Sequence, residues 1–428
     1  MNRQLPEDFL RLVRTAMGED RFARFEAALG EEPPVSIRLN PLKAKSMQPV
    51  GGIGVPWCSQ GFYLSARPNF TFDPLLHAGC YYVQEAASMF IDLIVRQHIT
   101  HPIAMLDLCA APGGKSTALL AALPEGSRLV SNEPVRQRYQ VLSENLAKWG
   151  YAGSATTNRY PADFRRDGVL FDAILCDVPC SGEGMFRKDP NAIGEWSLQN
   201  VDRCWRLQRD IVGDAWQCLK PGGMLIYSTC TFNTLENEEN IRWMQHQLGA
   251  EVLPVETKEE WGITGSLLEG FEAPVYRFIP GLTRSEGLFM CIVRKPSDFV
   301  HCRCTKRTLP MYETYTAGVQ NSKRRPKTAK TDAPSAPSPT EALSIGGPQA
   351  DYPVIDVDYP TAIAYLRREA ITLPTDAPRG YIAVSFQSHP IGFAKNIGQR
   401  ANNLYPKEWA IRSTYVPDSY SPVLLPAD

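Results

Sequence analysis

Two cysteines in the sequence lie where a thiol is able to take part in catalysis. Cys180 follows Asp177 and Pro179 directly after one apolar run, and Cys230 ends a second apolar run. Proline cannot continue a central strand, so the first strand ends before its thiol. Ligands of open α/β sheets bind at the carboxyl ends of strands, where the acid and both thiols would meet. With 11 cysteines in the chain, two also fall near strand ends by chance, and Cys180 alone is more typical of an incidental loop residue.

A glycine-rich segment, residues 109–115, joins an apolar run to a helical pattern and is suited to a cofactor. Its end resembles a phosphate-binding P-loop, but Cys109 replaces the first glycine and Pro112 removes a backbone donor. A nucleoside cofactor with a carboxylate fits better, because small residues admit it and the following helix N-terminus favours its charge. Glu133, at the end of the next expected strand, is placed to accept both ribose hydroxyl protons. The pattern favours S-adenosylmethionine over ATP and leaves an NAD enzyme open.

An acid and two thiols form the set that methylation of a pyrimidine at carbon 5 requires. Carbon 5 is a poor nucleophile, and a thiolate that adds to carbon 6 makes it able to attack a methyl sulfonium. A free cysteine has a pKa of about 8.5, so such a site has to favour the thiolate. An acid near ring nitrogen 3 stabilises the negative charge that develops there. A second thiol is able to assist when the carbon 5 proton and the first thiol leave.

Strand and helix patterns alternate between residues 103 and 296, and these elements have to position the reactive groups. The alternation predicts a mostly parallel sheet with helices on both faces. The thiols then follow the fourth and fifth strands, which are neighbours in a doubly wound sheet. The expected strands are 103–108, 128–133, 154–158, 173–177, 224–230 and 289–294, and the expected helices are 116–123, 136–149, 201–219 and 237–248.

A chain of 428 residues is expected to form two or three domains. Helical spacing up to about residue 30 is followed by strands and turns in a small mixed region. We interpret the basic and Pro/Ser-rich linker as largely disordered, with its basic part either available to phosphates or a plain spacer. Residues 303–330 of that linker carry eight basic residues and one acid. The predicted units are the N-terminal region 1–98, the alternating domain 99–297, the linker 298–350 and a β-rich module 351–428.

Composition limits the partners of the chain. A net charge of −1 gives no overall nucleic-acid signature, so RNA contacts require a local basic face. The first residues contain no apolar signal region and no stretch approaches the ~20 apolar residues of a membrane span, which predicts a cytoplasmic protein without membrane contact. In a reducing cytosol the cysteines are expected to be buried or reactive rather than disulfide-bonded. No second ligand pair accompanies His301, Cys302 and Cys304 at zinc-site spacing, so we expect no metal.

Three segments together resemble the RNA cytosine-5 methyltransferases of the Nol1/Nop2/Sun family: residues 107–115, 177–184 and 227–231. The resemblance implies that Cys230 is the nucleophile, that Cys180 aids product release and that Asp177 contacts cytosine. It also implies S-adenosylmethionine as the cofactor. The cofactor-binding residues expected on this basis are Cys109, Ala110, Ala111, Pro112, Gly113, Gly114, Lys115, Glu133, Asn158 and Asp177.

Further segments are similar to the 16S rRNA methyltransferase F branch of that family. Residues 36–41 and 82–89 resemble its N-terminal RNA-binding segment and the junction with the catalytic domain. Residues 182–190, 390–395 and 403–407 resemble the branch itself, which carries a C-terminal PUA-like module. The implied fold class is α/β: a Rossmann-like S-adenosylmethionine-dependent methyltransferase domain, a small α+β N-terminal RNA-binding region and a β-rich PUA-like RNA-binding domain.

One position departs from the family pattern, near the end of the third expected strand. The family usually has an acid or an amide there on the adenine side of the cofactor, whereas this chain has Tyr160 in the place of the acid. The adenine side of the cofactor is then expected to be contacted by Asn158, by Asp163 or by the backbone, and the sequence does not decide among them.

The sequence therefore predicts methylation of carbon 5 of cytidine in RNA through a covalent adduct between cysteine and carbon 6. Small-subunit rRNA is the expected substrate and tRNA the alternative, and the target base has to be unstacked. The expected partner is 16S rRNA or the 30S subunit, and the protein is expected to be a monomer. Arg187 and Lys188 are either phosphate contacts or part of a solvated face. A non-catalytic RNA-binding assembly factor is a second hypothesis, against which the complete set of acid and thiols argues.

Overall fold

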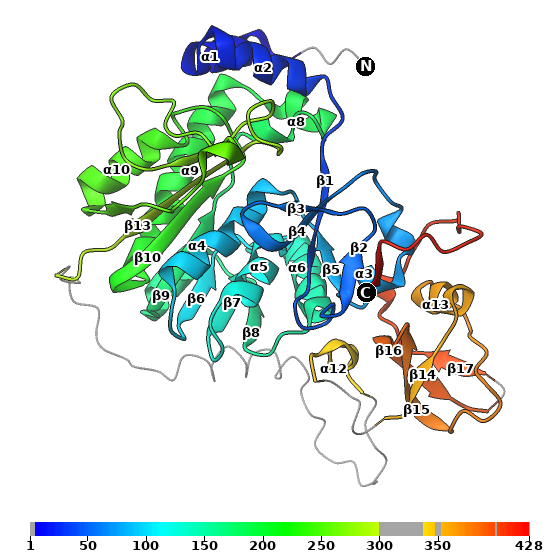
Figure 1. The fold of residues 1–428 in the computed structure, drawn as a ribbon. Coiled ribbons are helices and arrows are strands. Elements are labelled where there is room, and N and C mark those ends of the chain that lie inside the picture. Colours follow the sequence, from blue (N-terminus) through cyan, green and yellow to red (C-terminus); the bar gives the residue numbers. More distant parts are fainter. Residues whose placement is uncertain (1–4, 299–336, 347–351, 399, 428) are drawn as a thin grey trace.

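The computed structural model describes residues 5–298, 337–346, 352–398 and 400–427 (Figure 1). The described residues do not include the basic segment 303–330, which was considered above for phosphate binding. They also do not include His301, Cys302 and Cys304, which were considered above as a metal site.

One eight-stranded sheet lies at the centre of the molecule. Its strands are β6 (Ala104–Asp107), β7 (Arg128–Asn132), β8 (Ser154–Thr157), β9 (Phe171–Asp177), β10 (Leu219–Thr229), β11 (Glu251–Leu253), β12 (Tyr276–Phe278) and β13 (Leu288–Arg294). They follow the order β11-β13-β10-β9-β6-β7-β8, with β12 paired to β13 beside this path. Figure 1 labels the strands from β13 to β8. The pairs from β10 to β8 are parallel, and β13 is antiparallel to β10. The predicted mostly parallel sheet is confirmed, and β11 and β12 are strands that the sequence patterns missed.

Helices cover both faces of this sheet, because side chains of a buried strand alternate between the two faces. Met105 and Leu106, neighbours on β6, belong to the cores on opposite faces. The Ser197 side chain caps the start of α9 (Leu198–Gln217) by accepting the backbone N–H of Asn200. This cap explains why α9 begins before residue 201, where the sequence predicts its start. One face is covered by α4 (Phe90–His98), α5 (Gly114–Ala122) and α6 (Arg136–Trp149), and the other by α7 (Pro161–Asp167), α9 (Leu198–Gln217) and α10 (Glu238–Leu248).

The N-terminal region consists of a pair of helices and a small sheet. Gly18, with a φ of 75°, separates the two helices, so the helical spacing of the first 30 residues belongs to two elements. The elements are α1 (Glu7–Met17), α2 (Glu19–Leu29), β1 (Val35–Leu39), β2 (Met47–Pro49), β3 (Ile53–Val55), β4 (Cys58–Leu64), α3 (Pro74–His77) and β5 (Tyr81–Val83). The sheet has the order β3-β4-β1-β5.

Helices α1 and α2 pack against the loops that follow β9 and β10. The ring of Phe9 lies 4.9 Å from the ring of Phe186, and the ring of Phe25 lies 5.0 Å from the ring of Phe232. Edge-to-face aromatic pairs of this kind combine apolar burial with a preferred geometry. Helices α1 and α2 therefore support the two loops that carry the two thiols.

The C-terminal module shares a hydrophobic core with the N-terminal region. One cluster of buried residues includes Ile37 and Leu75 from the N-terminal region and Tyr365 and Tyr405 from the C-terminal module. The Tyr405 hydroxyl lies 3.3 Å from Nδ1 of His77. The module comprises β14 (Val354–Asp356), α13 (Tyr359–Leu366), β15 (Gly380–Phe386), β16 (His389–Asn396), β17 (Ala401–Asn403) and β18 (Leu424–Pro426). Strand β18 pairs with β2, so the end of the chain returns to the N-terminal region (Figure 1).

A short helix lies inside the segment that the sequence analysis reads as a linker. It is α12 (Pro339–Leu343), and the Ser338 and Glu341 side chains form a capping box at its start. Leu343 is 2% exposed, and the backbone N–H of Ile345 donates to the carbonyl of Gly150 at the end of α6. Residues 338–345 are therefore docked on the rest of the molecule rather than forming a plain spacer.

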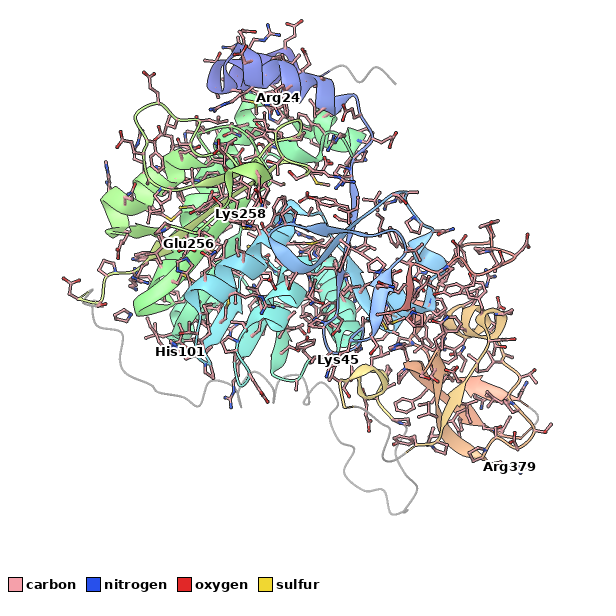
Figure 2. The ribbon with its side chains drawn as sticks, viewed as in Figure 1. Arg24, Lys45, His101, Glu256, Lys258 and Arg379 are labelled. Carbon is pink, nitrogen blue, oxygen red and sulfur yellow. The ribbon has the colours of Figure 1, made fainter. Side chains whose placement is uncertain are left out.

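Exposed basic side chains are distributed over separate parts of the surface. Figure 2 labels Arg24 on α2, Lys45 before β2 and Arg379 before β15, all of them exposed. Such a distribution agrees with a net charge near zero, since acidic residues such as Glu256 are also exposed (Figure 2).

The shared core predicts that the C-terminal module and the N-terminal region lose stability together. Tyr405 is 2% exposed, and replacing a buried aromatic residue by alanine costs about 3–5 kcal/mol of unfolding free energy. We expect Tyr405→Ala to lower the hydrogen-exchange protection of α3 and β5 as well as that of α13 and β16. Ile397→Ala, at a position 43% exposed, is the control and should change stability by less than about 0.5 kcal/mol. Loss of protection in the C-terminal module alone would contradict a shared core.

Candidate active site

A cavity of about 610 Å³ opens at the carboxyl ends of β6, β9 and β10. Residues 109–112 and 177–180 line it, together with Lys115 and Cys230. Residues 82–85, from the N-terminal region, form a further part of its wall. The structure thus brings together the acid, both thiols and most of the glycine-rich segment singled out in the sequence.

The two thiols face each other because β9 and β10 are adjacent and parallel. Asp177 on β9 lies opposite Ser228 on β10, so the cysteines that follow these strands reach the same place. The Sγ atoms of Cys180 and Cys230 are 3.1 Å apart, and the backbone N–H of Cys230 points at the sulfur of Cys180 at 3.4 Å. The predicted adjacency of the fourth and fifth strands is confirmed.

The surroundings of Cys180 favour its protonated form. The hydrogen bond with the Cys230 sulfur raises the pKa of the Cys180 thiol well above its usual range, and burial raises it further. Cys180 therefore keeps its proton and is able to donate it to the neighbouring sulfur.

A partly buried ion pair adjoins the thiols. Nζ of Lys115 donates to Oδ2 of Asp177 at 2.8 Å, and the Ser228 hydroxyl donates to Oδ1 of the same carboxylate at 2.8 Å. Burial lowers the pKa of Lys115, but the Asp177 carboxylate more than offsets this, and the pKa lies above its usual value. Lys115 thus supplies a permanent positive charge at the end of the cavity that holds Asp177 and Cys230.

Buried carboxylates lock the two thiol-bearing loops together. Glu183, in the short helical turn Glu183–Met185, accepts the backbone N–H groups of Phe232 and Asn233 at 2.7 and 3.0 Å. Glu236 accepts the backbone N–H of Ser181 at 3.0 Å, and burial raises the pKa of this carboxyl to about 7. Neither acid was predicted from the sequence to have a role, because nothing in their local sequence shows that they bridge to a loop about fifty residues away.

Glycine is required where the two loops touch. A Cβ on Gly184 would lie 2.9 Å from the carbonyl oxygen of Cys230 and 2.7 Å from that of Gly287. A Cβ on Gly287 would lie 2.4 Å from the Phe232 ring. The backbone N–H of Gly184 donates to the Cys230 carbonyl at 2.8 Å, so this close approach fixes the position of that cysteine.

The glycine-rich segment begins directly after a buried acid. Asp107 is fully buried at the end of β6, and Oδ2 accepts the Ser116 hydroxyl at 2.6 Å while Oδ1 has no hydrogen-bond partner. Burial raises the pKa of the Asp107 carboxyl to about 7. Gly113, with a φ of 108°, turns the chain into α5 and does not line the cavity; a Cβ there would lie 3.3 Å from the Leu142 side chain. Asp107 belongs to the cavity wall although the sequence analysis assigned it no role.

Three family models match this chain. A family model described as 16S rRNA methyltransferase RsmB/F matches residues 97–294. The N-terminal domain of 16S rRNA methyltransferase RsmF matches residues 5–86, and the methyltransferase RsmF PUA domain matches residues 352–411. The chain belongs to the RsmB/F family of 16S rRNA methyltransferases.

Relatives of the family have similar sequences. Ribosomal RNA small subunit methyltransferase F of Pectobacterium atrosepticum is 36% identical over 310 residues, which are 68% of this chain and 63% of the relative. The protein of the same name from Salmonella agona is 29% identical across 94% of this chain and 96% of the relative. The chain thus spans somewhat less than two thirds of the Pectobacterium relative in that alignment and nearly all of the Salmonella one.

Solved structures agree on the fold. A methyltransferase homologue protein from Pyrococcus horikoshii is 26% identical, with a TM-score of 0.54 over 68% of this chain and 100% of that chain. NSun6 from the same organism, solved with SFG, is 19% identical, with a TM-score of 0.57 over 70% of this chain and 100% of that chain. The second likeness concerns the fold alone, and both support the Rossmann-like methyltransferase architecture expected from the sequence.

The residues around the cavity fit the S-adenosylmethionine of such a methyltransferase. Oε2 of Glu133 and Oδ1 of Asp107 are buried carboxylate oxygens without hydrogen-bond partners, and they are able to accept ribose hydroxyl and ammonium protons. Glu133 does not itself line the cavity, whereas Arg138 does, and Nη1 of Arg138 lies 3.6 Å from Oε2 of Glu133. Arg138 was not predicted from the sequence, because it is a half-exposed side chain on α6 with no motif around it.

The residues weighed for the adenine side of the cofactor have other partners. The Asn158 side chain donates to the carbonyls of Glu133 and Pro134, at 2.7 and 2.9 Å, and does not line the cavity. Asp163 accepts the backbone N–H of Tyr160 at the start of α7, and the Tyr160 ring is 68% exposed. The structure therefore places Asn158 as a support of Glu133 rather than in the cavity wall.

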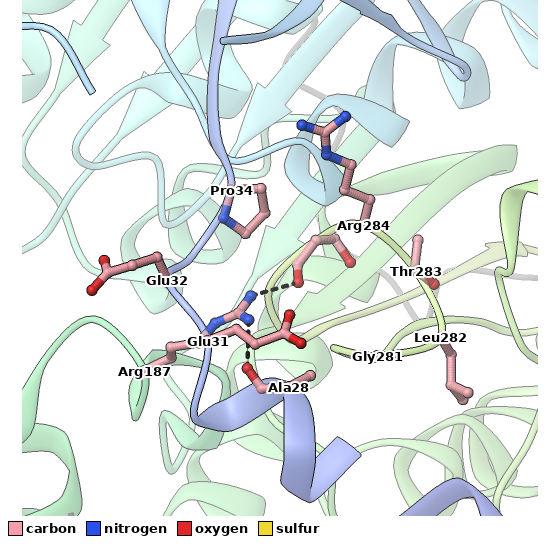
Figure 3. Close-up of a pocket in the computed structure, with 10 residues that line it drawn as sticks. Ala28, Glu31, Glu32, Pro34, Arg187, Gly281, Leu282, Thr283 and Arg284 are labelled. Carbon is pink, nitrogen blue, oxygen red and sulfur yellow. Dashed lines mark hydrogen bonds between the residues drawn. The ribbon is translucent and has the colours of Figure 1, made fainter. Parts of the chain in front are cut away.

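A second cavity of about 360 Å³ corrects the expectation for Arg187. It lies between the end of α2 and residues 281–285 (Figure 3). The guanidinium of Arg187 donates to the carbonyl of Ala28 at 2.8 Å and forms an ion pair with Glu286 at 2.5 Å. Arg187 is 7% exposed, so the prediction that it contacts phosphate or solvent is wrong, whereas Lys188 is exposed and lines the main cavity.

Among the described residues, no cluster of three or more His, Cys, Asp or Glu side chains is arranged to hold a metal ion. None of the helices within that part of the chain combines the length and the apolar character needed to cross a membrane.

The buried acid Asp107 predicts a dependence of stability on pH. Its pKa is about 7 in the folded protein, compared with about 3.9 in an unfolded chain. The folded state therefore binds the proton more tightly, and the unfolding free energy attributable to Asp107 falls as pH rises between these values. Asp107→Asn carries no charge, so we expect its melting temperature relative to the wild type to rise from about pH 5 to about pH 8.

Calorimetry of both proteins at the two pH values measures this difference. Asp376→Asn, at an exposed position, is the control and should follow the wild type at both pH values. A difference between Asp107→Asn and the wild type that is the same at both pH values would contradict the assignment.

Proposed function

We propose that the chain transfers the methyl group of S-adenosylmethionine to carbon 5 of a cytidine in the RNA of the small ribosomal subunit. The observation that carries this proposal is the pair of thiols 3.1 Å apart at the ends of adjacent parallel strands, beside Asp177. Membership of the RsmB/F family supports rRNA as the substrate class. We further propose that the partner is 16S rRNA or the 30S subunit, and that the protein acts as a monomer in the cytoplasm.

Cys230 is the nucleophile in this proposal. Its sulfur adds to carbon 6 of cytosine, a C–S bond forms, and the electrons of the carbon 5–carbon 6 double bond shift toward ring nitrogen 3. The ammonium group of Lys115, held by Asp177 at 2.8 Å, provides the positive charge that stabilises the negative charge developing at that nitrogen, and Asp177 contacts the cytosine. The bound cofactor supplies an electrophilic methyl group for carbon 5. Cys180 suits this first step poorly, because the hydrogen bond to Cys230 and its burial raise the pKa of its thiol.

Cys180 assists the release of the product. After methylation, carbon 5 has to lose its proton while the bond between carbon 6 and sulfur breaks. Cys180 passes its proton to the departing sulfur of Cys230 at 3.1 Å, and the Cys180 thiolate formed accepts the proton of carbon 5. The double bond is restored and both cysteines are thiols again. The one proton released overall is the proton that the Cys230 thiol loses to solvent when its sulfur attacks carbon 6, and S-adenosylhomocysteine leaves as the other product.

The RNA has to present the target cytidine outside a base-paired stack, because the reacting atoms of a stacked base cannot reach groups inside a cavity. Lys188, at the edge of the cavity, remains a candidate phosphate contact. The N-terminal region and the C-terminal module, which share one core, would hold the RNA as a single unit. We propose the domain boundaries 1–98, 99–297, 298–350 and 351–428 as functional limits, with α12 docked within the third segment.

Alanine substitutions of the two thiols are expected to separate attack from release. Cys230→Ala should abolish methylation of unmodified small-subunit rRNA, because no sulfur adds to carbon 6. Cys180→Ala should accumulate a covalent protein–RNA adduct that migrates slowly in a denaturing gel, because release is blocked while attack persists. Methyl incorporation and the adduct are measured in the same reaction.

Cys218→Ala is the matched control, since this buried thiol lies at the opposite end of β10, and it should turn over without an adduct. Normal turnover by Cys230→Ala would rule out the assignment of the nucleophile.

A further inference from the structure

The side chain of Gln84, directly after β5, carries an unused hydrogen-bond donor in the wall of the main cavity. Gln84 is 6% exposed and lines this cavity. Its Oε1 accepts the Nε–H of Arg38 at 2.7 Å, whereas Nε2 is buried without any hydrogen-bond partner. An arginine only donates, so the amide oxygen has to face Arg38 and the NH₂ group has to face elsewhere. A buried amide donor without a partner is costly, which indicates an acceptor that arrives with a ligand.

Arg38 holds this amide rigidly. It is fully buried on β1, and its guanidinium stacks 4.5 Å above the ring of Trp149. Nη2 donates to the hydroxyl of Thr117 on α5 at 2.5 Å, which ties the N-terminal region to the helix after the glycine-rich segment. Within the described residues no carboxylate is paired with Arg38, and its Nη1 also lacks a partner. The positive charge behind Gln84 therefore favours a negatively charged ligand in front of it.

The amide lies over the N-terminus of α5. A Cβ on Gly114, the first residue of this nine-residue helix, would be 3.6 Å from Nε2 of Gln84. The first turn of a helix has backbone N–H groups without internal partners, and they favour an anion at this place. The glycine-rich segment therefore has beside it a site for one small, negatively charged hydrogen-bond acceptor. The Gln84 amide, the N-terminus of α5 and the buried Arg38 cation all favour such a group.

We propose that Gln84 is a cofactor-binding residue that donates a hydrogen bond from Nε2 to the amino-acid carboxylate of S-adenosylmethionine, with Arg38 as its positioning residue. This inference rests on the proposed function. A carboxylate suits the site better than an RNA phosphate, because the amide is buried beside the glycine-rich segment and a polynucleotide backbone does not reach such a position. The N-terminal region then completes the cofactor site in addition to contacting RNA.

Two nucleosides that differ in the amino-acid part test this contact. S-adenosylhomocysteine carries the carboxylate, and 5′-methylthioadenosine carries the same adenosine and thioether sulfur without it. Calorimetry measures the dissociation constants of both for the wild type, Gln84→Ala and Gln84→Glu. The control is Gln48→Glu, the same change at an exposed position on β2.

We expect Gln84→Ala to weaken S-adenosylhomocysteine about 10-fold or more and to leave 5′-methylthioadenosine within about 2-fold, since hydrogen bonds to charged groups have this size. Gln84→Glu should weaken S-adenosylhomocysteine further through charge repulsion, and Gln48→Glu should match the wild type.

Equal weakening of both nucleosides would show general damage to the cavity and overturn the proposal, as would unchanged binding of both. A wild-type protein that binds neither nucleoside would refute the proposed function itself, so the two failures are distinguishable.

Discussion

The parallel pairing of β9 and β10 is the constraint on which the rest of the site depends. Asp177 stands opposite Ser228 in this pairing, and the chain leaves both strands at the same edge of the sheet. Only under this condition do two cysteines fifty residues apart come within 3.1 Å of each other. A slip of one residue would turn every side chain of β10 to the other face and remove the second thiol from the cavity. The cores on both faces of the sheet therefore protect the geometry of the thiols.

Buried polar groups hold the loops beyond these strands. Glu183 and Glu236 accept backbone N–H groups of the opposite loop, and Arg187 joins the end of α2 to Glu286. Buried ion pairs add little net stability when both partners are present. Removing one partner, however, lowers the unfolding free energy by about 3–5 kcal/mol. The loops thus have one low-energy arrangement, and this rigidity keeps the two sulfur atoms at a fixed separation.

The sequence predicts the parts of this site that local patterns encode. Alternating apolar runs indicate the order of strands and helices, and the positions of Cys180 and Cys230 after their strands follow from it. Contacts between distant segments leave no local pattern, so Gln84 and Glu236 could not be found in this way. Arg187 was misjudged for the same reason, since a basic residue in a polar segment reads as exposed unless its buried partner Glu286 is known. The docked helix α12 was missed because proline and serine at a helix start resemble a linker.

The central claim is that Cys230, rather than the more conspicuous Cys180, attacks cytosine. A small-subunit RNA containing 5-fluorocytidine tests it directly, because fluorine at carbon 5 cannot leave as a cation and the adduct persists. After reaction with the wild-type protein and S-adenosylmethionine, proteolysis and mass spectrometry identify the cysteine that carries the modified nucleotide. The account predicts the nucleotide on the peptide that contains Cys230. A nucleotide attached to Cys180, or no covalent product at all, would contradict it.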